Sequence, residues 1–177
     1  SSLTFHTPTP YFVIIRGPLG SGKTTVARRL AGEIGAEYFS IDQALEDRGV
    51  DHVGPDEECI PALNFLAAQE AMLPSIRESL ARGRPVIVDG NFYHREQIDH
   101  LVRALPFPNA IFALEAPVEL CIARDRARSK PLGEDAARAV HHLVSRFHAG
   151  IAIDAAKSAD AVLGAIMEQL SGINNGV

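Results

Sequence analysis

The sequence predicts an α/β fold in which helices cover one parallel β-sheet. Five short apolar segments alternate with segments whose apolar residues recur at helical spacing. One short segment, Val86–Asp89, is an uninterrupted apolar run that ends in an acid, which is typical of a parallel strand buried on both faces. The alternation calls for right-handed βαβ connections, and 177 residues with 46% hydrophobic content suffice for one core. We therefore expect residues 1–177 to form a single domain.

The first predicted strand, residues 11–15, leads into a glycine-rich loop. The pattern Gly17-x-x-x-x-Gly22-Lys23-Thr24 fits a P-loop, in which backbone N–H groups surround phosphates, the lysine reaches the terminal phosphates and the hydroxyl binds Mg²⁺. A helix predicted over Thr24–Ile34 adds the partial positive charge of its N-terminus. The expected phosphate-binding residues form one run: Gly17, Pro18, Leu19, Gly20, Ser21, Gly22, Lys23, Thr24 and Thr25.

The second predicted strand, Glu37–Asp42, ends in a carboxylate. Ligands of open α/β sheets bind at the carboxyl ends of strands, so Asp42 is a candidate catalytic and acceptor-binding residue. The competing interpretation makes Asp42 the N-cap of a short helix over residues 43–48. A loop then covers residues 49–61, and a helix over Ala62–Arg82 is expected to kink or divide at Pro74.

The third strand, Val86–Asp89, supplies a second carboxylate at the same edge of the sheet. We expect Asp89 to hold Mg²⁺ or touch the acceptor, although it could instead cap the following turn. Polar residues on the next loop could line an acceptor pocket, or could be solvated residues at the start of a helix over Arg95–Leu105. With Arg48 from the preceding segment, these candidates are Asn91, Tyr93, His94 and Arg95.

Two strands and three helices are expected in the remaining chain. The strands are Ala110–Leu114 and Ile151–Asp154, and the helices cover Pro117–Arg128, Glu134–Ala149 and Ala159–Leu170. Arg124 and Arg128 are four residues apart, so a helix would place both guanidinium groups on one face, over the nucleotide. The alternative is a solvated face with local ion pairs.

Two absent patterns narrow the function. No Asn-Lys-x-Asp or Thr-Lys-x-Asp is present to recognise guanine, and Asp89 is followed by Gly90 rather than by a glutamate that could polarise water. Transfer of a phosphoryl group to an acceptor other than water is therefore favoured over GTP or ATP hydrolysis.

The chain resembles the small P-loop kinases of the AAA_33 group, which are related to polynucleotide kinase, zeta toxin and chloramphenicol phosphotransferase and more broadly to adenylate, gluconate and shikimate kinases. The resemblance rests on the glycine-rich loop and on three further segments: Phe39-Ser40-Ile41-Asp42, Val86-Ile87-Val88-Asp89-Gly90-Asn91 and Arg124-Asp125-Arg126-Ala127-Arg128. It implies a three-layer P-loop NTPase fold with strand order 2-3-1-4-5, and the use of ATP and Mg²⁺.

The resemblance also implies roles for individual residues. Asp42 is similar to the carboxylate that orients the acceptor hydroxyl or accepts its proton. Arg124 is similar to the arginine that packs on adenine, and Arg128 to one that contacts phosphate, within a short lid over residues 124–134. Residues 43–82 would bind the acceptor, a small molecule or a nucleotide. The alternatives are an ATP-binding regulatory module without transferase activity and a nucleic-acid 5′-hydroxyl kinase.

Composition restricts the partners and the compartment. A net charge of −5 disfavours nucleic acid as a partner. Cys59 and Cys121 occur in segments that look helical and have no metal-ligand spacing, which suits free thiols in a reducing cytoplasm. No apolar run is long enough to span a membrane, and residues 1–10, to which we assign no role, do not read as a signal peptide. His141, His142 and His148 lack the spacing of a metal site.

Overall fold

The computed structural model describes residues 9–175, so most of the stretch 1–10 lies outside the described residues. Its five strands form one sheet in the order β2-β3-β1-β4-β5, and every neighbouring pair is parallel. The strands are β1 (Phe12–Arg16), β2 (Glu37–Ser40), β3 (Val86–Gly90), β4 (Asn109–Glu115) and β5 (Ile151–Asp154). The predicted fold class and strand order are confirmed.

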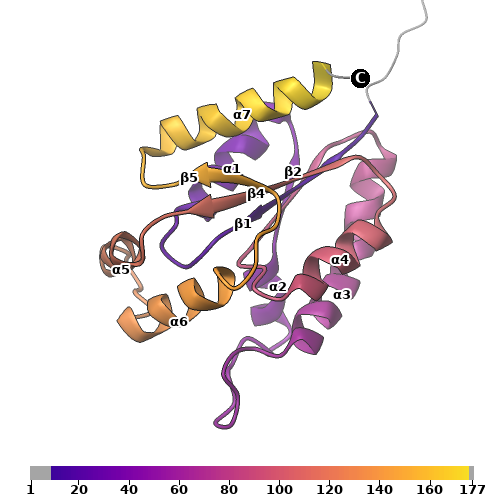
Figure 1. The fold of residues 1–177 in the computed structure, drawn as a ribbon. Helices are drawn as coiled ribbons and strands as arrows, with labels where there is room; N and C mark the ends of the chain where they lie inside the picture. The colour runs from indigo at the N-terminus through magenta and orange to yellow at the C-terminus, as the bar shows by residue number, and fades with distance from the viewer. Residues whose placement is uncertain (1–8, 176–177) are drawn as a thin grey trace, which may run out of the picture.

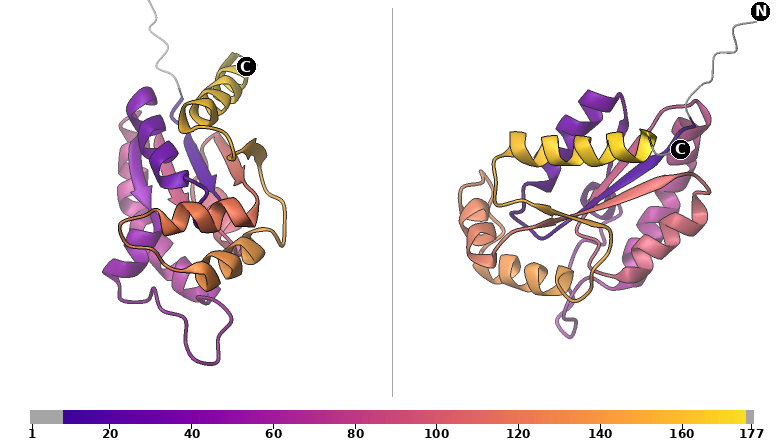
Figure 2. Two further views of the ribbon diagram at one scale, coloured as in Figure 1. Left: turned by 90° about the vertical axis from the view of Figure 1, so that its left-hand side faces the viewer. Right: turned by 45° about the horizontal axis from the view of Figure 1, so that its top comes forward.

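Helices cover both faces of the sheet (Figures 1 and 2). On one face lie α1 (Lys23–Ile34) and α7 (Ala159–Asn175), and on the other lie α3 (Ala62–Ala81) and α4 (Arg95–Ala104). The short helix α2 (Ile41–Asp47) follows β2 directly. Between β4 and β5 the chain forms α5 (Val118–Arg126) and α6 (Glu134–Val144), and Figure 1 shows α5 beyond the arrowheads of the strands.

Strand β1 is enclosed by two separate cores. Its side chains alternate between faces, as the period of a strand requires. Val13 and Ile15 belong to the core beneath α1 and α7, whereas Phe12 and Ile14 belong to the core beneath α3 and α4. All four side chains have no exposed surface. The strand that leads into the glycine-rich loop is therefore held rigidly from both sides.

The predicted end of the second strand is wrong. Strand β2 stops at Ser40, and Asp42 is the second residue of α2. The Ser40 hydroxyl accepts the Gln43 N–H at 3.1 Å, so the N-cap is Ser40 and not Asp42. This cap begins the helix two residues earlier than the hydrophobic pattern indicated, and Asp42 is presented from the first helical turn.

Three further boundaries differ from the expectations. Helix α3 continues through Pro74, whose exposed position leaves the carbonyl one turn earlier open to water. Cys59 lies in the segment before α3 and not in a helix. Helix α6 ends at Val144, where the Ser145 hydroxyl donates to the His141 carbonyl oxygen at 2.7 Å, so His148 lies outside the helix.

Within residues 9–175, none of the helices combines the length and the apolar character needed to cross a membrane.

Replacing Ile14 with alanine is expected to lower the free energy of unfolding by about 2–5 kcal/mol, because the fully buried side chain leaves a cavity beneath α3 and α4. Urea denaturation measures the effect. Val102→Ala, at a position that is 38% exposed, serves as the control and should change stability by less than about 0.5 kcal/mol. Similar losses for the two variants would contradict this account of β1.

Candidate active site

The glycine-rich loop connects the buried end of β1 to the N-terminus of α1. Gly22 and Gly20 have φ angles of +82° and +81°, a region that L side chains rarely adopt. A Cβ atom on Gly20 would lie 2.2 Å from the Cys121 carbonyl oxygen in α5. No side chain in the described residues caps the N-terminus of α1. Its backbone N–H groups therefore remain available to an anion.

A cavity of ≈410 Å³ opens in front of this loop and brings together the four residues predicted to be catalytic. Lys23 is buried, with 7% of its surface exposed, whereas Asp42 and Arg128 are exposed and Arg124 is half-buried. The cavity is lined by Leu19, Gly20, Gly22, Lys23, Thr24, Thr25, Asp42, Arg124, Arg128 and Leu132. Residues 19–42 and residues 124–132, which are far apart in the sequence, thus contribute side chains to one cavity.

Asp89 lies at the end of β3, beside the glycine-rich loop. Its side chain is 3% exposed, and Oδ2 accepts a hydrogen bond of 2.5 Å from the Tyr38 hydroxyl. Oδ1 is buried without a hydrogen-bond partner among the described residues. Burial raises the pKa of Asp89, while Lys23 and the hydroxyls of Tyr38 and Thr24 oppose that rise. The carboxylate is thus held next to the residues expected to bind phosphate and metal.

The donor set fits Mg²⁺. The unpartnered Asp89 oxygen and the Thr24 hydroxyl are hard oxygen ligands, which Mg²⁺ prefers. In the described part of the chain, no group of three or more His, Cys, Asp or Glu residues could hold a metal ion. An ion at this site would therefore depend on phosphate and water for its remaining ligands, as Mg²⁺ does in phosphoryl-transfer sites.

Arg124 ties three parts of the site together. Its guanidinium group donates to the carbonyl oxygens of Ala155 at 2.7 Å, Ser21 at 3.4 Å and Lys157 at 3.4 Å. A cavity of ≈230 Å³ lies between Arg124, the glycine-rich loop and residues 155–159. The segment after β5 therefore borders Arg124 directly.

Arg128 lines the cavity from the turn after α5 and not, as expected, from the helix itself. Helix α5 ends at Arg126, so Arg124 and Arg128 do not share a helix face. The Asp125 carboxylate, 1% exposed, accepts the N–H groups of Leu132 at 3.1 Å and Gly133 at 2.8 Å and lies 3.8 Å from Arg128. These bonds fold residues 127–133 back on α5, and this turn carries Arg128 to the cavity.

A groove of ≈480 Å³ adjoins the cavity and shares Thr24, Asp42 and Arg128 with it. Its remaining lining comes from α1, β2, α2 and α3: Arg28, Tyr38, Phe39, Ser40, Gln43, Ala44, Glu46, Asp47 and Met72. Three carboxylates and two guanidinium groups line the groove. Asp42 therefore stands between the phosphate-binding loop and a polar space large enough for a small molecule.

The candidates on the loop after β3 make mainly structural contacts. The Tyr93 hydroxyl accepts the Ile60 N–H at 3.2 Å, and the His94 ring lies 2.8 Å from the Ile60 carbonyl oxygen. His94 is also the N-cap of α4, and Arg95 stacks at 4.7 Å on the Phe147 ring. Neither Asn91, which has a buried amide oxygen without a partner in the described residues, nor exposed Arg48 lines the cavity or the groove.

Two residues escaped the sequence analysis, Tyr38 in the groove and Arg146 outside it. Tyr38, whose pKa burial and Asp89 raise to about 12, is in the strand next to β3, but this pairing follows only from the sheet order. Arg146 donates to the Tyr93 carbonyl oxygen at 3.4 Å. Burial raises the pKa of Tyr93 to about 12, Asp42 adds to the rise and Arg146 opposes it. Arg146 has no motif around it that would have revealed this position.

Residues 12–152 match the sequence profile of a family described as an AAA domain, AAA_33. The chain belongs to the AAA_33 family. This family assignment, with adenylate and shikimate kinases among the relatives, confirms the resemblance stated above.

In sequence, the chain matches only part of the length of each of two longer relatives. The AAA_33 chain is 33% identical over 118 residues to adenylate kinase 9 from Mus musculus, which covers 61% of this chain and 6% of that protein. It is 30% identical over 152 residues to a tRNA dimethylallyltransferase from Thermus thermophilus, covering 71% of this chain and 48% of that one. The chain thus spans about half or less of these relatives, and one of them is named for a reaction other than phosphoryl transfer.

Solved structures of small kinases share the fold. A gluconokinase from Sinorhizobium meliloti superposes with a TM-score of 0.69 at 18% identity, covering 95% of both chains. A sugar kinase from Janibacter superposes with a TM-score of 0.73 at 20% identity, covering 93% of this chain and 95% of the other. At such identities the likeness establishes the P-loop kinase fold.

Gly20→Ala is expected to abolish ADP binding and to destabilise the protein. The new methyl group would clash with the Cys121 carbonyl oxygen, and alanine rarely adopts the positive φ of residue 20. Gly32→Ala in α1 is the matched control. It meets no atom within 4 Å and should raise the free energy of unfolding by about 0.5–1 kcal/mol. Calorimetric ADP titration and thermal unfolding measure both variants, and normal ADP affinity in Gly20→Ala would contradict the proposed packing.

Tyr38→Phe is expected to weaken Mg²⁺-dependent ADP binding at acidic pH. The Tyr38 hydrogen bond lowers the pKa of Asp89, so its loss raises that pKa further and keeps the carboxyl protonated to a higher pH. Mg²⁺ binds the ionised carboxylate. When ADP affinity in the presence of Mg²⁺ is measured against pH, its fall on the acidic side should therefore occur at a higher pH in the variant. Tyr93→Phe, which removes a hydroxyl with no contact to Asp89, should leave the pH of that fall unchanged.

Proposed function

We propose that the protein is an ATP- and Mg²⁺-dependent kinase that transfers the γ-phosphate to a hydroxyl group of a small polar acceptor. The observation that carries the proposal is that Asp42 lines both the cavity before the phosphate-binding loop and the adjoining groove. A carboxylate between two such spaces can contact an acceptor hydroxyl while the phosphates are held by the loop.

The proposed reaction assigns a task to each group. Lys23 and the N–H groups of the loop bind the β- and γ-phosphates, and Thr24 with Asp89 holds Mg²⁺, which neutralises charge on the phosphates when bound. Asp42 orients the acceptor hydroxyl and accepts its proton as the oxygen bonds to the γ-phosphorus. The bond from that phosphorus to ADP breaks. Arg128 stabilises the charge that develops, and Arg124 borders the adenine.

The charge of the groove supports a neutral, hydroxyl-bearing acceptor. Asp42, Glu46 and Asp47 outnumber Arg28 and Arg128 among its lining residues. An acceptor that already carries phosphate would meet this excess of carboxylates, and a nucleic-acid backbone would meet a chain of net charge −5. A small polyol or sugar would instead find hydrogen-bond acceptors for its hydroxyls. A nucleotide acceptor is the second candidate, because two guanidinium groups border the groove.

Asp42→Asn is expected to lower turnover about 100-fold to 10,000-fold while ADP affinity stays within about twofold, since the carboxylate acts on the acceptor. ADP release is measured with ATP and a panel of sugars, polyols, nucleosides, nucleoside monophosphates and 5′-hydroxyl oligonucleotides. Asp99→Asn, an exposed position on α4 outside both spaces, is the matched control and should retain full activity.

The panel separates the alternatives. Acceptor-dependent ADP release that disappears in Asp42→Asn supports the kinase. ATP binding without transfer to any acceptor, together with no effect of Asp42→Asn, would overturn it in favour of an ATP-binding regulatory module. Activity confined to oligonucleotides, with strong salt dependence, would instead indicate a nucleic-acid 5′-hydroxyl kinase.

A further inference from the structure

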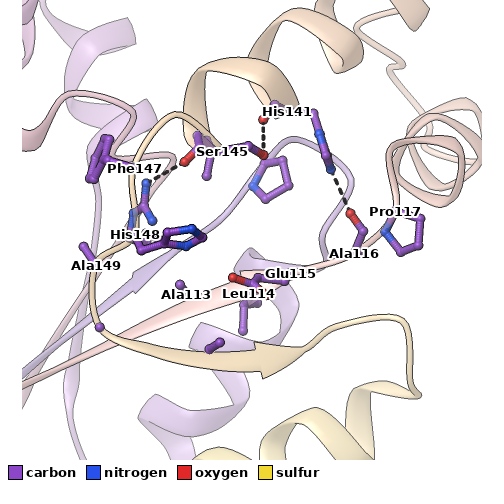
Figure 3. A pocket seen from close by; sticks show the side chains of 15 residues that line it. Ala113, Leu114, Glu115, Ala116, Pro117, His141, Ser145, Phe147, His148 and Ala149 are labelled. Atoms are coloured by element: carbon purple, nitrogen blue, oxygen red, sulfur yellow. Dashed lines mark hydrogen bonds between the residues drawn. The ribbon is translucent and has the colours of Figure 1, made fainter.

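A second cavity lies on the other side of the start of the glycine-rich loop, with Pro18 in its wall. It has a volume of ≈440 Å³ and is enclosed by the C-terminal end of α6, the segment that follows it and the strands β1, β4 and β5. None of its lining residues borders the phosphate-binding cavity or the adjoining groove. Figure 3 shows His148 between the end of α6 and strand β4, with Ala113 and Leu114 along the strand. The volume is in the range of small-molecule sites.

Arg16 is the charged group in the wall of this cavity. It is the last residue of β1 and is 2% exposed. Its Nη2 atom donates to the carbonyl oxygens of Phe92 and Val144, both at 3.1 Å, and its guanidinium group lies 4.5 Å from the centre of the Phe147 ring. Nε is buried without an acceptor among the described residues.

The positive charge of Arg16 has no ion-pair partner in the described part of the chain. Burial and, to a smaller extent, Arg95 lower its pKa to about 10, while Glu115 opposes the change, so the group remains charged at neutral pH. Buried charges in proteins are ordinarily paired with a charge of opposite sign. The cation beside the cavity therefore lacks an ion pair, and Glu115 acts on it only from a longer distance.

The other polar groups around the cavity are one more guanidinium group, two histidines and one carboxylate. Arg95 stacks on the same Phe147 ring at 4.7 Å. His141 and His148 line the cavity, and Glu115 is the lone carboxylate among the lining residues. The His141 ring lies 2.8 Å from the Ala116 carbonyl oxygen, which fixes its position (Figure 3). Apart from these groups the wall is mainly apolar, with Leu114, Val144 and Phe147 among its side chains.

We propose that this cavity is a binding site for a small organic anion, a carboxylate attached to an apolar body, which places its charge toward Arg16. The carboxylate would supply the ion-pair partner that Arg16 lacks among the described residues, and the apolar body would cover Leu114, Val144 and Phe147. Sites of this kind combine an apolar lining with a few convergent polar groups. The cavity adjoins the glycine-rich loop at Pro18 but shares no lining residue with the phosphate-binding cavity or the groove, so neither proposal depends on the other.

The test uses benzoate and its neutral analogue benzamide as probes, followed by ¹H–¹⁵N spectra of the full chain. Benzoate is expected to shift the amide signals of residues 147–150 in a saturable manner and to bind at least tenfold more tightly than benzamide. Equal affinity for the two probes would overturn the proposal, because the buried charge would then contribute nothing.

A variant that fills the cavity tests its location without disturbing the contacts of Arg16. Ala152 is an exposed residue of β5 in the lining, and Ala152→Leu is expected to weaken benzoate binding at least tenfold. Ala67→Leu, at an exposed position of α3 outside the cavity, should leave affinity unchanged. Undiminished binding to Ala152→Leu would overturn the assignment.

Lys23→Ala separates this site from the phosphate-binding loop. Benzoate binding is expected to persist in that variant, whereas loss of benzoate binding would show that the loop is the anion site and would overturn the proposal. An Arg16→Gln variant that remains folded, as its thermal unfolding would show, should lose the preference for benzoate over benzamide.

Discussion

The burial of β1 on both faces is the constraint on which the rest of the site depends. The first four side chains of this strand belong to two cores, so polar groups begin only at its last residue, Arg16. Strands β3 and β4 flank it in parallel and end at the same edge. Phosphate-binding backbone, the Asp89 carboxylate and the start of α5 therefore converge there, and Gly20 closes the contact with α5.

Features set by local sequence could be predicted. The glycine-rich loop needs only a fixed spacing of glycine, lysine and threonine, and Asp89 follows an apolar run that could only be a buried strand. Both sites follow from residues adjacent in the chain. The sheet order came from the family resemblance, because strand pairing between distant segments leaves no local pattern.

Features set by tertiary contacts could not be predicted. Tyr38 meets Asp89 only because β2 pairs with β3, and Arg16 donates to the Val144 carbonyl oxygen only because the end of α6 packs over the end of β1. The predicted ends of helices and strands were wrong where local contacts ended an element before its hydrophobic periodicity did. The Ser40 cap shortened a strand, and the end of α5 at Arg126 separated two arginines that periodicity had placed on one face.

The Asp125 carboxylate has a consequence for the order of residues 125–133. By accepting the N–H groups of Leu132 and Gly133, it closes residues 125–133 into a ring that is anchored at the buried end of α5. Much of the entropy of ordering this segment is therefore lost when the protein folds and not when a nucleotide arrives. Arg124 is likewise fixed before a nucleotide arrives, because it is bound to three carbonyl groups on neighbouring segments.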